Sequence, residues 1–173
     1  EFSNRLFTGT GKFASKEQIP EMLEASQSEM ITVALRRVDS DSQTENILHY
    51  IPENVQLLPN TSGARTAQEA IRIANIAREA GCGDFVKIEV INDQKWLMPD
   101  NEETLKATQK LAEDGFIVLP YVSPDVVLAK KLEKAGAAAV MPLGSPIGSH
   151  QGKKKKKRIE MLIEVCQVPV IVD

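Results

Sequence analysis

Short apolar runs recur along this chain and alternate with segments of helical periodicity, and this pattern constrains the fold more than any other feature. The runs are rich in valine, isoleucine and leucine, as is typical of strands buried on both faces. They are Leu6-Phe7, Ile31 to Leu35, Val55 to Leu58, Phe85 to Ile91, Phe116 to Leu119, Ala138 to Met141 and Val168 to Val172. The pattern predicts about seven strands joined by crossover segments.

The segments between most of these runs carry helix start and stop signals. A capping residue is followed three positions later by Glu or Gln at Ser15, Thr66 and Asp100. Ser123-Pro124 adds a predicted N-cap with proline at the first helical position. A glycine follows each of the predicted helices 67–80, 102–114 and 125–135. Strict alternation with the strands predicts six helices in all.

One repeating βα unit favours a parallel α/β barrel over an open, doubly wound sheet. A closed (βα)8 TIM barrel needs eight strands, whereas about seven strands and six helices are present here. We therefore expect residues 1–173 to form a single, truncated barrel domain. Roughly 70 to 80 residues of a typical barrel would lie beyond Asp173.

The charge distribution excludes several functions. The segment from Lys153 to Arg158 supplies six of the 21 lysines and arginines, which leaves 15 basic against 24 acidic residues elsewhere. This balance argues against nucleic acid and anionic membranes as partners. No apolar stretch approaches the length of a membrane span, so we expect a cytoplasmic protein. Cys82 and Cys166 lack metal-type or disulfide-type spacing, which predicts reduced structural thiols.

Lys87 is the residue that most suggests a chemical activity. It lies in the apolar run from Phe85 to Ile91, where alternation puts Phe85, Lys87 and Glu89 on the same face. Burial favours the neutral amine, whereas a nearby carboxylate favours the ammonium. A lysine in such surroundings can act as a nucleophilic amine that forms a Schiff base. The alternative is a structural ion pair between Lys87 and Glu89 inside a barrel.

Two further candidates follow strands, at the edge where a barrel carries its active site. Asp173 comes directly after the last apolar run. The segment from Pro142 to Ser149, which includes Gly148, is a Gly/Ser/Pro loop whose amides could approach an anionic ligand. Ordinary turn chemistry explains this loop nearly as well. His49 and His150 lack partners at ligand spacing, so no metal is expected.

Several segments of the chain resemble those of bacterial thiazole synthases of thiamin biosynthesis, in the same order and at the same spacing. The matching segments are Arg5 to Phe13, Thr32 to Asp39, Leu58 to Thr61, Val86 to Ile91, Met98 to Asp100, Val140 to Gly148 and Val168 to Asp173. They extend over essentially the whole chain.

The resemblance implies an enzyme that builds thiazole phosphate from three components. These are 1-deoxy-D-xylulose 5-phosphate, dehydroglycine, and sulfur delivered as a thiocarboxylate on a small sulfur-carrier protein. Lys87 matches the lysine that forms an imine with the sugar ketone, and Glu89 and Asp173 match carboxylates proposed to move protons. Gly148 matches a glycine of the loop that binds the sugar phosphate. The resemblance also implies a homotetramer, and no cofactor is expected.

The chain departs from the family pattern in places. Lys153 to Lys157 replace a mixed helix start, and Ala64 stands where cysteine is frequent. A family glycine-rich turn would follow Asp173. Two alternatives stay open at this point: another Schiff-base barrel, such as a sugar-phosphate aldolase, and a non-catalytic fragment that serves as an oligomer or carrier-binding scaffold.

Overall fold

A computed structural model describes residues 2–11, 13–34 and 47–173. In this part of the chain a parallel six-stranded sheet follows the sequence order β1-β2-β3-β4-β5-β6. The strands are β1 (Phe7–Gly9), β2 (Met30–Ala34), β3 (Gln56–Asn60), β4 (Phe85–Ile88), β5 (Ile117–Val122) and β6 (Met141–Pro142). Every neighbouring pair is parallel, which confirms the predicted α/β barrel class.

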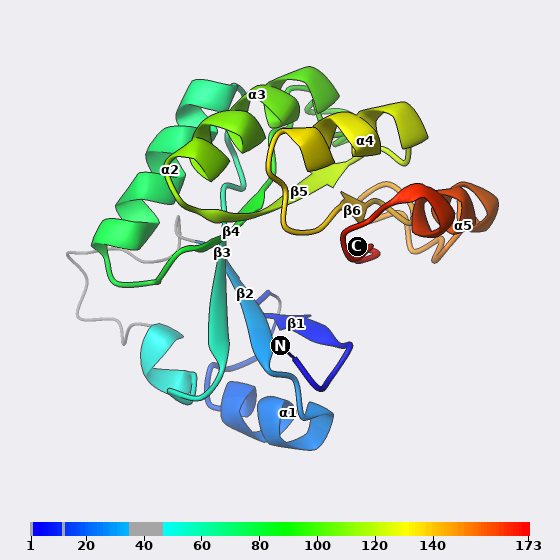
Figure 1. Ribbon diagram of the computed structural model, residues 1–173. Coiled ribbons are helices and arrows are strands. Elements are labelled where there is room, and N and C mark those ends of the chain that lie inside the picture. Colours follow the sequence, from blue (N-terminus) through cyan, green and yellow to red (C-terminus); the bar gives the residue numbers. More distant parts are fainter. Residues whose placement is uncertain (1, 12, 35–46) are drawn as a thin grey trace.

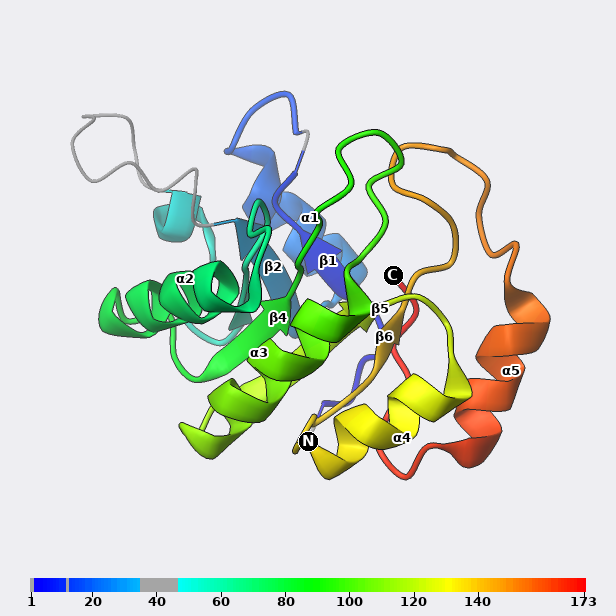
Figure 2. The same ribbon diagram turned by 90° about the horizontal axis from the view of Figure 1, so that it is seen from above.

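The helices lie outside the curved sheet (Figure 1). They are α1 (Gln18–Ser26), α2 (Ala67–Glu79), α3 (Asn101–Glu113), α4 (Val126–Lys134) and α5 (Lys156–Val165). Seen from above, α2, α3 and α4 follow one another along the outer face (Figure 2). Between β2 and β3 there is a 3-10 turn, η2 (Ile47–Tyr50). The helix expected there falls largely on residues 35–46, which lie outside the described part of the chain.

Strand β4 separates two apolar clusters, as its alternating pattern predicts. Val86, Ile88 and Val90 face outward and pack on small residues of α2 and α3, including Ala70 and Ala107. The other face looks into the barrel, where an inner cluster is formed by residues from all six strands. Its buried members are Met30, Leu58, Leu119, Ala139 and Met141, with Phe7, Phe85 and Ile171 partly buried against them. Lys87 therefore projects into the barrel interior.

The seventh apolar run lies beside β6 but is not a regular strand. A single parallel bridge joins Val170 to Val140. The Val140 amide nevertheless donates to the Pro169 carbonyl at 2.9 Å, and the Ile171 amide donates to the Val140 carbonyl at 2.9 Å. Because Pro169 has no N–H, the ladder cannot begin earlier. The segment therefore occupies the predicted place of a seventh strand.

Two of the predicted helix N-caps are confirmed and two are wrong. The side chains of Thr66 and Asp100 accept from the amides of Glu69 and Glu103, so both predicted caps are confirmed. The predicted cap at Ser123 is wrong, because Asp125 accepts from two amides of the first turn of α4 instead.

Ser15 was also predicted wrongly, since α1 starts at Gln18 and its cap, Glu17, makes no side-chain capping bond. The predicted stops at Gly81, Gly115 and Gly136 are confirmed, each with positive φ. Cys82 and Cys166 are free thiols, as predicted, and burial raises the pKa of each.

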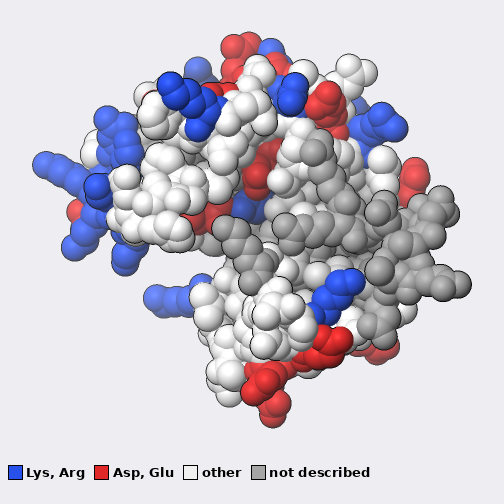
Figure 3. Space-filling view, turned by 180° about the vertical axis from the view of Figure 1, so that it is seen from behind, with Lys and Arg blue, Asp and Glu red and all other residues white. Residues whose placement is uncertain are grey.

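The last two lysines of the run 153–157 form the start of α5. The helix begins at Lys156, with Ile159 and Leu162 on its buried face. The basic side chains gather at this end of the molecule (Figure 3). Of the helices in the described residues, none is long and apolar enough to cross a bilayer.

Candidate functional site

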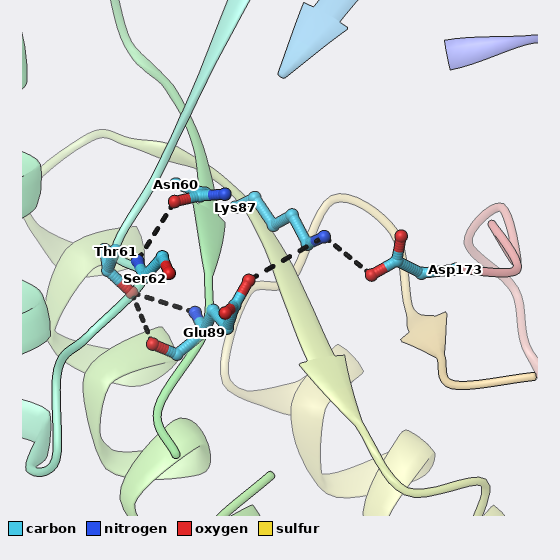
Figure 4. Close-up of polar contacts among 6 residues, drawn as sticks. All are labelled: Asn60, Thr61, Ser62, Lys87, Glu89 and Asp173. Carbon is cyan, nitrogen blue, oxygen red and sulfur yellow. Dashed lines mark hydrogen bonds and ion pairs between the residues drawn. The ribbon is translucent and has the colours of Figure 1, made fainter. Parts of the chain in front are cut away.

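The candidate site is centred on the Lys87 amine, inside the barrel. Lys87 is the third residue of β4, and its alternation with Val86 and Ile88 turns the side chain inward. Only 7 % of the residue is exposed. The Nζ atom lies 2.6 Å from Asp173 Oδ2 and 4.0 Å from Glu89 Oε2 (Figure 4). A buried ammonium requires such partners, because desolvation without pairing is costly.

Glu89 follows β4 on the same inner face. Its carboxylate is buried, and burial raises the pKa of Glu89 above its ordinary value. The negative charge of Asp173 raises this pKa further, whereas Lys87 and a hydrogen bond with the Ser62 side chain lower it. Burial is the largest of these effects, so the protonated acid is favoured at higher pH than in an exposed glutamate. Such a group can donate as well as accept a proton.

Asp173 is held at the edge of the sheet by main-chain hydrogen bonds. Its amide donates to the Pro142 carbonyl at 3.1 Å, and its carbonyl accepts from the Gly144 amide at 2.7 Å. These bonds extend the β6 ladder and direct the carboxylate toward Lys87. The Asp173 side chain is 38 % exposed, compared with 8 % for that of Lys87. The structure therefore brings together all three predicted catalytic candidates.

Two cavities meet at Asp173. The larger, of about 1030 Å³, runs along the barrel interior and reaches Lys87 and Asp173. The smaller, of about 540 Å³, is lined by Asp173, Tyr121 and the loop 144–148. Gly148 lies in this second cavity, with φ +75°. The predicted loop glycine is thus close to the carboxylate of the site without bonding to Lys87.

Sequence reasoning missed an aromatic residue of the site. Tyr121, near the end of β5, is 2 % exposed, and its ring centroid lies 5.2 Å from Lys87 Nζ. Alternation with the inward-facing Leu119 could have placed it there. Burial raises the pKa of the Tyr121 hydroxyl, and so do the charges of Asp173 and Glu89.

The turn after β3 was also missed as a contributor. Residues Asn60, Thr61 and Ser62 lie beside Glu89 (Figure 4). The Thr61 hydroxyl forms hydrogen bonds with the main chain of Glu89. Asn60 and Thr61 lie in one of the matching segments, but the partner of Thr61 is 28 positions away. No local pattern reports such a contact.

The arrangement suits chemistry at a carbonyl carbon. An amine between two carboxylates can lose its proton to one of them and attack a carbonyl, and the other can protonate the departing oxygen. In the described residues, no group of three His, Cys, Asp or Glu side chains is placed to hold a metal ion. Fold and site together define a parallel βα-barrel protein with a buried, carboxylate-flanked lysine at the carboxyl end of a strand.

Comparison with known proteins gives the family. The model of the thiazole biosynthesis protein ThiG matches residues 1–173. The thiazole synthase of Heliobacterium modesticaldum is 62% identical over 173 residues, and that of Clostridioides difficile is 57% identical over 173 residues. Both alignments cover 100% of this chain and 68% of the relative. The chain belongs to the ThiG family of thiazole biosynthesis proteins, the thiazole synthases of thiamin biosynthesis.

Solved structures agree with the fold. A crystal structure of the Amycolatopsis orientalis BexX/CysO complex superposes with a TM-score of 0.84 at 29% identity, covering 99% of this chain and 70% of that one. A dihydrodipicolinate synthase superposes with a TM-score of 0.62 at 16% identity, covering 95% and 62%. The second likeness shows the fold alone. It gives no support to the alternative of an aldolase.

Proposed function

We propose that this chain supplies the imine-forming part of a thiazole synthase site, in which Lys87 condenses with the ketone of 1-deoxy-D-xylulose 5-phosphate. The observation that carries the proposal is the buried Lys87 amine, 2.6 Å from Asp173 and 4.0 Å from Glu89, at a cavity of about 1030 Å³. A purely structural ion pair inside the barrel would not need a cavity beside the amine.

The two carboxylates would move protons in this reaction. One accepts a proton from the Lys87 ammonium, and the neutral amine then adds to the ketone carbon. Loss of the ketone oxygen as water needs an acid, which suits Glu89 because burial raises its pKa. The resulting iminium acidifies the neighbouring carbon, so that a carboxylate within reach can remove a proton and give the enamine. We assign this step to Asp173, whose side chain is the more exposed partner of Lys87.

We further propose that the sulfur arrives as a thiocarboxylate on a small carrier protein and that dehydroglycine supplies the remaining ring atoms. The similar Amycolatopsis orientalis structure is a complex of two proteins, BexX and CysO, which supports a protein partner. A homotetramer in the cytoplasm completes the proposal. Exposed apolar side chains on helices support an assembly, among them Val127 on α4 (62 % exposed) and Ile163 on α5 (60 % exposed).

Covalent trapping tests the role of Lys87. Borohydride reduction of full-length protein with 1-deoxy-D-xylulose 5-phosphate should leave an adduct that mass mapping assigns to Lys87. Lys87→Arg should abolish it, because a guanidinium stays protonated. Lys110→Arg is a matched control, since Lys110 also lies 2.6 Å from a carboxylate, that of Asp114, but is exposed on α3. An adduct on another lysine would contradict the assignment.

A second test concerns the sugar phosphate. Gly148 has φ +75°, and a Cβ there would meet open space, so Gly148→Ala strains the main chain of the loop without filling the cavity. We expect a higher KM for the phosphorylated sugar. Gly81→Ala is the control, because Gly81 has φ +84° at the end of α2 and also faces open space. Equal KM values for the two variants would remove the loop from phosphate binding.

A further inference from the structure

The turn that follows β3 is built around Thr61. The Thr61 carbonyl accepts from the Ala64 amide at 3.0 Å, and the Asn60 side chain accepts from the Ser62 amide at 3.0 Å. Gly63 has φ +92°, which a residue with a side chain rarely adopts. The strand therefore ends in a tight turn at the height of Lys87 and Glu89.

This turn interrupts the ladder between β3 and β4. The two strands pair at Asn60 and Lys87, and the Thr61 amide donates to the Lys87 carbonyl at 3.1 Å. In a continuing parallel ladder, the Glu89 amide would next donate to the Thr61 carbonyl. That carbonyl is already bonded to Ala64. The main chain of Glu89 thus loses its regular partner where the site begins.

The Thr61 hydroxyl takes the place of the missing ladder bonds. It accepts from the Glu89 amide at 2.8 Å and donates to the Glu89 carbonyl at 2.9 Å, and Thr61 is fully buried. Main-chain pairing resumes one residue later, at the bridge between Ala64 and Val90. One hydroxyl therefore fixes both main-chain polar groups of Glu89.

The same turn also reaches the Glu89 side chain. Ser62 lies beside Glu89 (Figure 4), and its side chain lowers the pKa of the Glu89 carboxyl. Neighbouring residues of one tight turn thus bond the main chain of Glu89 and act on its carboxyl. Figure 4 shows this turn on the side of Glu89 opposite Asp173.

We propose that Thr61 and Ser62 are positioning residues that set the place of the Glu89 carboxylate relative to the Lys87 amine. The inference rests on the proposed imine chemistry and assigns two further residues to it. Another buried threonine shows the contrast. The Thr108 hydroxyl bonds the Thr104 carbonyl one turn away within α3, and so acts only within its own helix.

The central test is Thr61→Val, which keeps the shape and removes the hydroxyl. We expect the Lys87 adduct to form while kcat falls by on the order of 10-fold to 10²-fold, the range for a small misplacement of a reacting group. KM should change little, and Thr61→Ser should restore turnover. Thr108→Val is the matched control, and its turnover should equal that of the wild type. Equal turnover of Thr61→Val and Thr108→Val would overturn the proposal.

A double-mutant cycle shows whether Thr61 acts through Glu89. In a Glu89→Gln background, Thr61→Val should cause no further loss of turnover, because the positioned carboxylate is already gone. A further loss by the same factor as in the wild-type background would contradict the proposal. Absence of the Lys87 adduct in the wild type would instead defeat the proposed function, so the two failures are distinct.

The titration of Glu89 gives a readout independent of turnover. Carbon-13 NMR of glutamate-labelled protein can follow this carboxyl, with Glu89→Gln identifying its signal. Ser62→Ala leaves the turn's main-chain bonds in place and should raise the pKa of Glu89, because the Ser62 side chain lowers that pKa. If Thr61→Val does not fold, the Glu89 titration in Ser62→Ala still tests the proposed role of the turn. An unchanged Glu89 titration in Ser62→Ala would overturn the role of the turn.

Discussion

Lys87 and Asp173 are 86 positions apart in the chain, yet their side chains meet at 2.6 Å in the barrel interior. Lys87 is carried by β4 and Asp173 by the segment beside β6, with β5 between them. The contact therefore depends on the curvature of the sheet, which turns both inner faces toward the same space. Any change that flattens the sheet separates the amine from its nearest carboxylate.

Removing the carboxylates should separate imine formation from turnover. Glu89→Gln and Asp173→Asn keep the shape of each side chain, and each variant retains one carboxylate beside Lys87 that can serve imine formation, so the Lys87 adduct should still form. Turnover should fall by on the order of 10²-fold or more, as for the loss of a general acid or base. Borohydride trapping and steady-state kinetics measure the two steps. Loss of the adduct in both variants, with circular dichroism unchanged, would mean that the carboxylates only tune Lys87.

Glu89 should make folding stability depend on pH in an unusual direction. Because burial raises its pKa, the native state holds a proton that the unfolded state has released, between the ordinary value of 4.5 and the raised one. The contribution of Glu89 to stability is therefore present at low pH and is lost as pH rises through this window.

The variant Glu89→Gln removes this titration. It should unfold at higher denaturant than the wild type near neutral pH, and the difference should shrink as pH falls toward 4.5. Urea titrations over a pH series measure the effect, with the exposed Glu164→Gln as control. A variant that is less stable than the wild type at neutral pH would show that pairing with Lys87 outweighs burial.

The corrected helix cap can be tested in the same way. Asp125 accepts from the amides of Val127 and Leu128 at 2.8 Å, so Asp125→Ala should lower the free energy of unfolding by about 1 kcal/mol. Ser123→Ala should have a smaller effect, because only the Ser123 amide is bonded, to the Asn101 side chain. Chemical denaturation compares the two. A larger loss for Ser123→Ala would restore the cap predicted from sequence.

The sequence was sufficient for the features that depend on local chemistry. Alternation along 85–91 correctly predicted that Lys87 shares a face with Phe85 and that Val86 lies on the opposite face, because successive side chains of a strand point to opposite faces. Glycines placed the ends of α2, α3 and α4, since the left-handed main chain there favours glycine. The cap predicted at Ser123-Pro124 was wrong, because the Asp125 side chain accepts from two amides of the first turn of α4 instead.

The site itself was predictable only in part. Lys87, Glu89 and Asp173 are recognisable as chemical groups at strand ends, but their distances depend on the curvature of the whole sheet. Tyr121 was missed because one aromatic residue in an apolar strand has the same pattern as a core residue. Thr61 was missed because its role depends on a tight turn in which its carbonyl bonds the Ala64 amide instead of β4. Hydrophobic periodicity carries no information about such a bond.

Tyr121 should stabilise the iminium formed on Lys87 through its ring face. Its centroid lies 5.2 Å from Nζ, and burial raises the pKa of its hydroxyl, so the ring stays neutral at working pH. Tyr121→Phe keeps the ring and should leave turnover within about threefold of the wild type. Tyr121→Leu removes a contact of about 0.5 to 2 kcal/mol to the iminium. The level of trapped adduct should then fall by roughly 2-fold to 30-fold.

Adduct yield over a series of sugar concentrations measures this effect, with thermal unfolding to confirm that both variants are folded. If Tyr121→Phe were as impaired as Tyr121→Leu, the hydroxyl rather than the ring would be the contributing group. Tyr121 would then act as a hydrogen-bond donor toward Asp173 or the substrate, and its ring would only fill space against Ile91 and Leu143. The ratio of the two adduct yields thus separates an electrostatic role of the ring from a polar role of its hydroxyl.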